Sequence, residues 1–196
     1  MATLELNSAL RAISQKKFDS FYCLLGEERY FSERVLRQLR HDVVGDDLRE
    51  FNETLFYASD VEVSDVLDSL QTLPVMASHR LVILKEAHLL NEKDWSAIES
   101  IDLASIQSTV FVIVASTLDK RKKTIKKLLE RASLIECLTP PDSARAPWIR
   151  SMAREKNLEL DPDALAFLVQ MGGNSLEELE RSLEQLLLFY GTNRGE

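Results

Sequence analysis

Short apolar runs, rich in β-branched and aromatic residues, recur along residues 1–139, and each has the length of a strand. Runs of this kind are typical of strands in a sheet that is covered on both faces. The longest continuous example, VFVIV from residue 110, predicts a central strand. The five predicted strands are residues 21–25, 51–57, 80–84, 109–115 and 133–138.

The segments between these runs carry apolar residues at spacings of three and four, the period of an amphipathic helix. Such stripes lie within residues 30–39, 63–70, 95–101 and 125–129. Alternating strands and helices imply parallel pairing through right-handed crossovers. Residues 1–139 are therefore predicted to form an α/β domain with a parallel five-stranded sheet.

The pattern changes at Pro140 and Pro141, because two consecutive prolines remove two backbone donors and keep the preceding residue out of the helical region. Beyond this linker the apolar spacing is helical throughout. Asp161 followed by Pro162 is a typical helix start, with a capping side chain and proline in the first turn. Residues 140–196 are predicted to form a small domain of three helices.

Composition and charge narrow the class of protein. With 45% hydrophobic and 29% charged residues the chain is of the ordinary globular type, and its apolar stretches are shorter than the roughly 20 residues that span a bilayer. A net charge of -8 argues against a stand-alone nucleic-acid binder. Cys23 and Cys137 have neither metal-site nor redox-pair spacing. Because no export signal begins the chain, we expect a cytoplasmic protein without membrane contact.

The glycines exclude the common phosphate-binding loops. Gly-x-Gly-x-x-Gly and Gly-x-x-x-x-Gly-Lys-Ser/Thr cannot form from the six glycines, at positions 26, 45, 172, 173, 191 and 195. Glu27 and Glu28 follow the first predicted strand, where a phosphate site presents bare amides and a lysine. Lys85 follows the third, where a magnesium nucleotide site has an aspartate. We therefore expect no nucleotide, metal or other cofactor.

An apolar stretch lies between the second helical stripe and the third predicted strand. That helix must end before Pro74, so Leu73, Val75 and Met76 fall in an extended or turn conformation. Two interpretations are open. The side chains pack inward as part of the core, or they point outward as an anchor that fills a partner's hydrophobic pocket, with Val75 and Met76 as its plug.

A basic segment follows the fourth predicted strand. Lys120, Arg121, Lys122 and Lys123 lie near the start of a predicted helix, and residues 120–131 contain seven cations. These side chains form either a solvated helix face or a contact to DNA phosphates or an acidic partner. The segment has no aromatic residues on which bases could stack.

Four segments occur in a characteristic order: YCLLGEERYFSERVLRQL from residue 22, LQTLPVMASHRLVIL from residue 70, VFVIVASTLDKRKK from residue 110, and GGNSLEELERSLEQLLLFY from residue 172, after the Pro-Pro linker. In this order and spacing the chain resembles the delta subunit family of the bacterial DNA polymerase III clamp loader. The resemblance implies an AAA+-like domain whose nucleotide site has decayed, followed by a helical lid domain, and no intrinsic catalysis.

The resemblance also implies a binding motif. Members of the family bind the ring-shaped beta sliding clamp and hold one of its interfaces open. A short motif, with glutamine first and two hydrophobic residues last, enters the clamp's peptide pocket. By position, Gln71 matches the glutamine, Leu73 an apolar spacer, and Val75 and Met76 the plug. Met76 departs from the family, which often has an aromatic residue there.

Further partners follow from the same resemblance. The family reaches the other loader subunits through a third, C-terminal collar domain, for which residues 1–196 hold no counterpart, and it meets DNA only within the assembled loader. Clamp binding is expected to survive without the collar, whereas loader assembly is not.

Two enzymatic alternatives stay open. One is an ATP-binding AAA+ subunit with an atypical phosphate site around Gly26. The other is a small hydrolase or transferase that uses scattered carboxylates such as Asp46, Asp47 and Glu86, although their spacing matches no known site.

Overall fold

The computed structural model describes residues 3–102, 106–171 and 175–190. The chain divides into two compact units: Met1–Glu27 with Phe31–Cys137, and Glu28–Tyr30 with Leu138–Glu196. Nothing in the sequence indicates that Glu28–Tyr30 belong with the helical unit. Each unit is described by itself below.

The first unit is built on a parallel sheet, which has six strands within the described ranges. In space the strands are ordered β1-β6-β2-β5-β4-β3, and neighbouring strands run parallel. The strands are β1 (Thr3–Leu4), β2 (Phe21–Leu25), β3 (Glu53–Tyr57), β4 (Arg80–Lys85), β5 (Thr109–Ala115) and β6 (Ser133–Glu136). The predicted parallel five-stranded sheet is confirmed as β2 to β6. The added strand β1 pairs with β6 and has two residues, too few for a periodic pattern.

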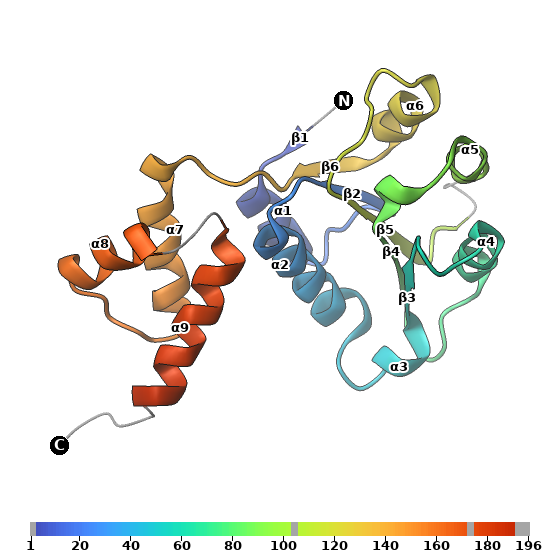
Figure 1. Cartoon of the computed structure of the whole chain (residues 1–196). Helices are drawn as coiled ribbons and strands as arrows, with labels where there is room; N and C mark the ends of the chain where they lie inside the picture. The colour runs from blue at the N-terminus through green and yellow to red at the C-terminus, as the bar shows by residue number, and fades with distance from the viewer. Residues whose placement is uncertain (1–2, 103–105, 172–174, 191–196) are drawn as a thin grey trace. The chain divides into compact units, whose positions relative to one another are not determined.

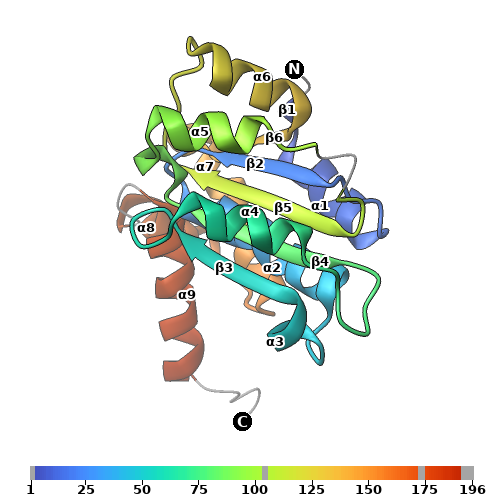
Figure 2. The same ribbon diagram turned by 90° about the vertical axis from the view of Figure 1, so that its right-hand side faces the viewer.

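Helices cover both faces of this sheet (Figures 1 and 2): α4, α5 and α6 lie along one face, and α1 and α2 along the other. Their bounds are α1 (Leu6–Ser14), α2 (Arg29–Leu39), α3 (Arg49–Asn52), α4 (Val63–Gln71), α5 (Glu92–Glu99) and α6 (Lys123–Arg131). A π-helical turn (Arg40–Val44) follows α2, and a 3-10 turn (Ala87–Leu89) follows β4. This layering explains why the interiors of the central strands are apolar without interruption, as in Leu81–Leu84 of β4 and Val110–Ala115 of β5.

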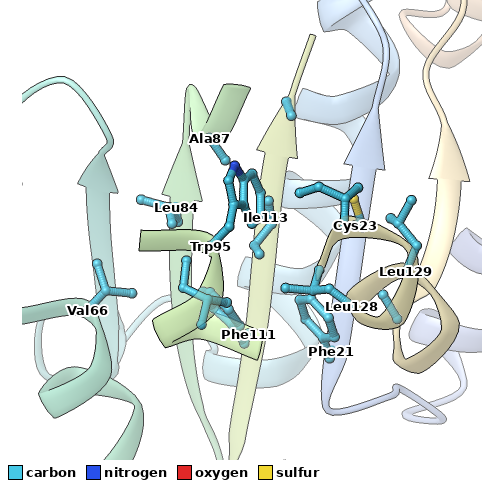
Figure 3. Close-up of a cluster of buried hydrophobic side chains, with 14 of the residues drawn as sticks. Phe21, Cys23, Val66, Leu84, Ala87, Trp95, Phe111, Ile113, Leu128 and Leu129 are labelled. Carbon is cyan, nitrogen blue, oxygen red and sulfur yellow. The ribbon is translucent and has the colours of Figure 1, made fainter. Parts of the chain in front are cut away.

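The core beneath α4, α5 and α6 contains alternate residues of the strands, because successive side chains of a strand point to opposite faces (Figure 3). Phe21 of β2 and Phe111 of β5 stack at its centre, with ring centroids 5.4 Å apart. Cys23 belongs to this core, and burial raises the pKa of its thiol to about 12. The thiol is therefore a small apolar core group and stays protonated at neutral pH.

The structure corrects three strand boundaries. Phe51 and Asn52 end the short helix α3 and do not begin the strand, which starts at Glu53. The last strand ends at Glu136 and does not reach residue 138. Strand β4 extends by one residue beyond its prediction, to Lys85. Because of the first difference, the fully buried Asn52 is the last residue of a helix and not part of a strand.

The second unit contains three helices in its described part: α7 (Asp142–Glu155), α8 (Pro162–Met171) and α9 (Leu176–Tyr190). The Asp161 side chain accepts a hydrogen bond from the Ala164 N–H at 2.7 Å, which is the predicted cap of α8. Within the described ranges, no helix combines the length and the apolar character that crossing a bilayer requires.

Candidate functional site

The residues between α4 and β4 form the most exposed apolar stretch of the first unit. Helix α4 ends at Gln71, before Pro74 as predicted, and the backbone of Thr72 is already extended. The Thr72 hydroxyl donates to the Asp68 carbonyl at 3.0 Å, which satisfies one of the last carbonyls of the helix. Figure 2 shows this connection at the same end of the sheet as α3.

The side chains of this stretch face solvent. Leu73 is 75% exposed, Val75 48% and Met76 88%, and Gln71 is exposed as well. Single exposed apolar residues are ordinary, but three within four positions are typical of a binding surface. Of the two interpretations left open by the sequence, inward packing does not apply to Leu73 and Met76. We call residues 71–76 the exposed segment.

Asn52 anchors the backbone of the exposed segment. Its Nδ2 donates to the Val75 carbonyl at 2.9 Å, and its Oδ1 accepts from the Val75 N–H at 2.6 Å. The Asn52 side chain is itself fully buried. The segment therefore combines solvent-facing apolar side chains with a backbone that is fixed to the domain. No sequence pattern points to Asn52, because it lies in a run that resembles a strand, 23 positions before Val75.

The backbone at Met76 is unusual, because its φ of 53° lies in the left-handed region. This conformation costs a residue with a side chain about 1 kcal/mol. Such a residue keeps it only where the surrounding contacts determine the backbone. The fixed Val75 next to it provides one such contact.

The position that corresponds to a phosphate loop is closed by backbone packing. Gly26 has a φ of 146°, and a Cβ added there would lie 2.0 Å from the Cys137 carbonyl oxygen. Its N–H donates to the Ala115 carbonyl at 3.0 Å. Glycine at this position therefore serves close packing between chain segments, and its amide is not free for a phosphate oxygen.

At the start of α2 a side-chain carboxylate lies where a phosphate-binding protein would bind the phosphate of its ligand. Glu28 is 1% exposed, and its Oε1 accepts from the Tyr30 N–H at 3.3 Å. At the end of β4, where a nucleotide site has its aspartate, Lys85 forms an ion pair with Glu33. Glu28 therefore opposes a phosphate at the start of α2, and Lys85 opposes a magnesium ion at the end of β4.

The carboxylates considered for catalysis do not converge. Asp46 and Asp47 precede β3, whereas Glu86 follows β4. Because β3 and β4 run parallel, these residues lie toward opposite ends of the two strands. The Asp46 side chain is 84% exposed, and Glu86 accepts a hydrogen bond from the Ser59 hydroxyl at 3.2 Å. In the part of the chain that the structure describes, no three His, Cys, Asp or Glu residues could hold a metal ion.

The basic segment differs from its prediction in two respects. Helix α6 begins only at Lys123, so the three preceding cations lie in the turn before it. These three cations are engaged with carboxylates on the surface: Lys120 with Glu136 at 3.1 Å, Arg121 with Asp119 at 2.9 Å and Lys122 with Glu92 at 2.9 Å. Exposed pairs of this kind are weak, so a contact of residues 120–123 with DNA or an acidic partner stays a prediction.

The sequence of the chain is similar to one protein family and to several known proteins. The family model described as DNA polymerase III, delta subunit, matches residues 22–138. The DNA polymerase III subunit delta of Bacillus subtilis (strain 168) is 25% identical over 191 residues, which cover 92% of this chain and 55% of that protein. Protein STICHEL-like 1 of Arabidopsis thaliana is 27% identical over 129 residues, 65% of this chain and 11% of that protein. The chain thus spans about half the length of its Bacillus relative.

Solved structures share the fold. The Bacillus subtilis DNA clamp loader delta protein (YqeN) superimposes with a TM-score of 0.74 at 24% identity, covering 95% of this chain and 58% of that chain. Domain III of the Thermotoga maritima replication initiation protein DnaA gives 0.59 at 12% identity, covering 97% and 85%. These likenesses concern the fold alone, an α/β sheet domain followed by helices.

Proposed function

The chain belongs to the family of DNA polymerase III delta subunits, and we propose that it binds the beta sliding clamp and opens the clamp's ring during loading onto primed DNA. In this proposal the exposed segment is the clamp-binding element. Gln71 is its leading residue, Leu73 its spacer, and Val75 with Met76 its plug. The chain hydrolyses no ATP itself.

The exposure of the segment is the observation that carries the proposal. Val75 is 48% exposed and Met76 88%, so burial of their remaining exposed area supplies roughly 2 to 4 kcal/mol before ordering costs. That amount is typical of a binding hot spot, in which a few apolar anchors fill a pocket of the partner. Because the Val75 backbone is already bonded to the domain, part of the ordering cost is met before the clamp binds.

Ring opening then follows from differential affinity. A ligand shifts an equilibrium between closed and open states only by the difference between its affinities for the two. The plug holds the chain on the clamp, and contacts of the domain near the ring interface favour the open ring. ATP hydrolysis by other loader subunits sets the time of release.

Further partners belong to the assembled loader. We propose that the chain meets the other loader subunits through a collar domain of the family and that it reaches DNA only within that assembly. Binding to the clamp alone is therefore the activity that residues 1–196 can be tested for in isolation.

The plug is tested by truncation of its two side chains. The Val75→Ala/Met76→Ala variant is expected to bind purified sliding clamp about 10- to 100-fold more weakly than the wild-type chain in a fluorescence titration. Leu89→Ala/Leu188→Ala is a matched control, because those side chains are 56% and 84% exposed, and it should bind like the wild type. Unchanged affinity of the plug variant, with an intact fold by circular dichroism, would exclude the anchor.

Ring opening needs its own measurement. A donor and an acceptor fluorophore placed across one interface of the clamp should move apart when the wild-type chain is added, and the plug variant should leave the signal unchanged at the same concentration. Tight binding without any change of the transfer efficiency would leave clamp binding standing and contradict ring opening.

A further inference from the structure

We propose that Asn52 is a positioning residue that holds the exposed segment in its clamp-binding conformation before the clamp arrives. The inference rests on the proposed function, since it assigns to Asn52 an effect on clamp affinity exerted through Val75. It adds to the binding motif a residue from a different element, the last residue of α3.

The Asn52 amide pairs with Val75 as a neighbouring strand would. It donates to the Val75 carbonyl at 2.9 Å and accepts from the Val75 N–H at 2.6 Å. The same Nδ2 donates to the Leu48 carbonyl at 3.2 Å. These three bonds define the orientation of the amide, because a flipped amide would face two carbonyls with its oxygen and an N–H with its nitrogen. Only asparagine offers this donor and acceptor on so short a side chain.

The positioning residue is buried, whereas the residues that it positions are exposed. The Asn52 side chain is 0% exposed, whereas Val75 is 48% and Met76 is 88% exposed. Asn52 therefore cannot touch a partner that docks on this surface. Any effect of its substitution on clamp affinity is therefore indirect, and the backbone of Val75 is the route that this inference assigns.

The segment is held on both sides of Val75 as well. Before it, the Thr72 hydroxyl is bonded to the Asp68 carbonyl. After it, the His79 ring packs edge-to-face on Phe18, with centroids 5.0 Å apart. Asn52 supplies the middle attachment, next to the left-handed backbone of Met76. Without this attachment the plug samples other conformations, and the apparent affinity falls by the fraction of chains that are binding-competent.

Substitution of Asn52 tests the inference directly. Asn52→Ala should weaken binding of the full chain to purified sliding clamp about tenfold or more, mainly through slower association, because fewer chains hold the competent conformation. Asn52→Asp should weaken it too, since a carboxylate cannot donate to the Val75 carbonyl. Asn91→Ala is the matched control: it removes a helix-capping asparagine from α5 and should leave clamp affinity unchanged. Wild-type affinity of a folded Asn52→Ala variant would overturn the inference.

A double-mutant cycle separates positioning from general destabilisation. In the Val75→Ala/Met76→Ala background, Asn52→Ala should cause little further loss, because the side chains it positions are gone. A full additional loss would overturn the positioning role. If Val75→Ala/Met76→Ala alone binds like the wild type, the proposed function fails. If only the Asn52 variants bind like the wild type, the proposed function stands and this inference fails.

Hydrogen exchange of the wild-type chain tests the attachment without any variant. The Val75 amide should exchange much more slowly than an exposed, unbonded amide, because its proton is bonded to the buried Asn52 Oδ1. Exchange of the Val75 amide at the rate of an unstructured peptide would overturn the inference, even where the Asn52 variants do not fold.

Discussion

The Glu28 carboxylate accepts a hydrogen bond from the Leu176 N–H at 2.9 Å, although the two residues lie 148 positions apart in the chain. Both belong to the second compact unit. With its other oxygen Glu28 accepts from the Tyr30 N–H. One buried side chain thus satisfies the backbone N–H groups of Tyr30 and Leu176, both within the second unit.

Glu28→Gln should destabilise the protein, because an amide has one acceptor oxygen for the two N–H groups that the carboxylate serves. A buried donor left without a partner costs roughly 1 to 3 kcal/mol of unfolding free energy. Chemical denaturation monitored by circular dichroism measures this loss. Glu27→Gln is the matched control, since Glu27 is exposed, and it should change stability by less than about 0.5 kcal/mol. Equal stabilities of the two variants would contradict this role of Glu28.

Nucleotide binding should be absent at the Gly26–Tyr30 turn. The Gly26 amide donates to the Ala115 carbonyl, and Glu28 already accepts from the Tyr30 amide at the start of α2. A fluorescent ATP analogue titrated with magnesium should therefore show no saturable binding in the micromolar range. Saturable binding would favour the alternative of an ATP-binding subunit and contradict our description of this turn.

The Asp119 carboxyl, in the turn before α6, should have an unusually low pKa. Hydrogen bonds from the Arg121 side chain and backbone lower the pKa of Asp119 from 3.8 to about 2. Because the folded state favours the ionised carboxyl, this pair contributes stability above about pH 3.8, and the contribution is lost as the pH falls toward 2. NMR titration of the Asp119 carboxyl carbon measures the pKa.

Two substitutions control this titration. Arg121→Ala should return the pKa of Asp119 toward its ordinary value, whereas Lys120→Ala should not, since Lys120 pairs with Glu136. An Asp119 pKa near 3.8 in the wild-type chain would show that the turn is not formed in solution.

The sheet could be predicted because its central strands are buried on both faces. Val112 and Ile113, for example, follow one another in β5 and point to opposite faces of the sheet, and both are buried. The sequence there is therefore apolar without interruption. The end of α4 could be predicted as well, because Pro74 keeps the residue before it out of the helical conformation. Helix α3, with four residues, is barely more than one helical turn and is too short for an apolar residue to recur on one face. Phe51 and Asn52 therefore resembled the start of a strand.

The candidate site was only partly predictable. Position in the motif marks Val75 and Met76, but the apolar character of a residue does not decide whether it packs inward or faces solvent. In the structure these side chains are exposed, and the Asn52 side chain bonds to the Val75 backbone. Two hydrogen bonds between one side chain and a backbone 23 positions away leave no periodicity or composition to detect. The expectation that no standard phosphate loop forms rests on missing glycines and lysine, which the sequence displays directly.

The Met76 side chain offers the most direct measurement of the central claim. The chain has four methionines, which [methyl-13C]methionine labelling resolves by NMR. Met76 is 88% exposed, and Met152 of α7, at 1%, serves as the internal reference. On addition of stoichiometric sliding clamp, the account predicts a shift and strong broadening of the Met76 methyl signal in excess of the general broadening shown by Met152. A clamp that binds the chain and leaves Met76 unchanged relative to Met152 would contradict it.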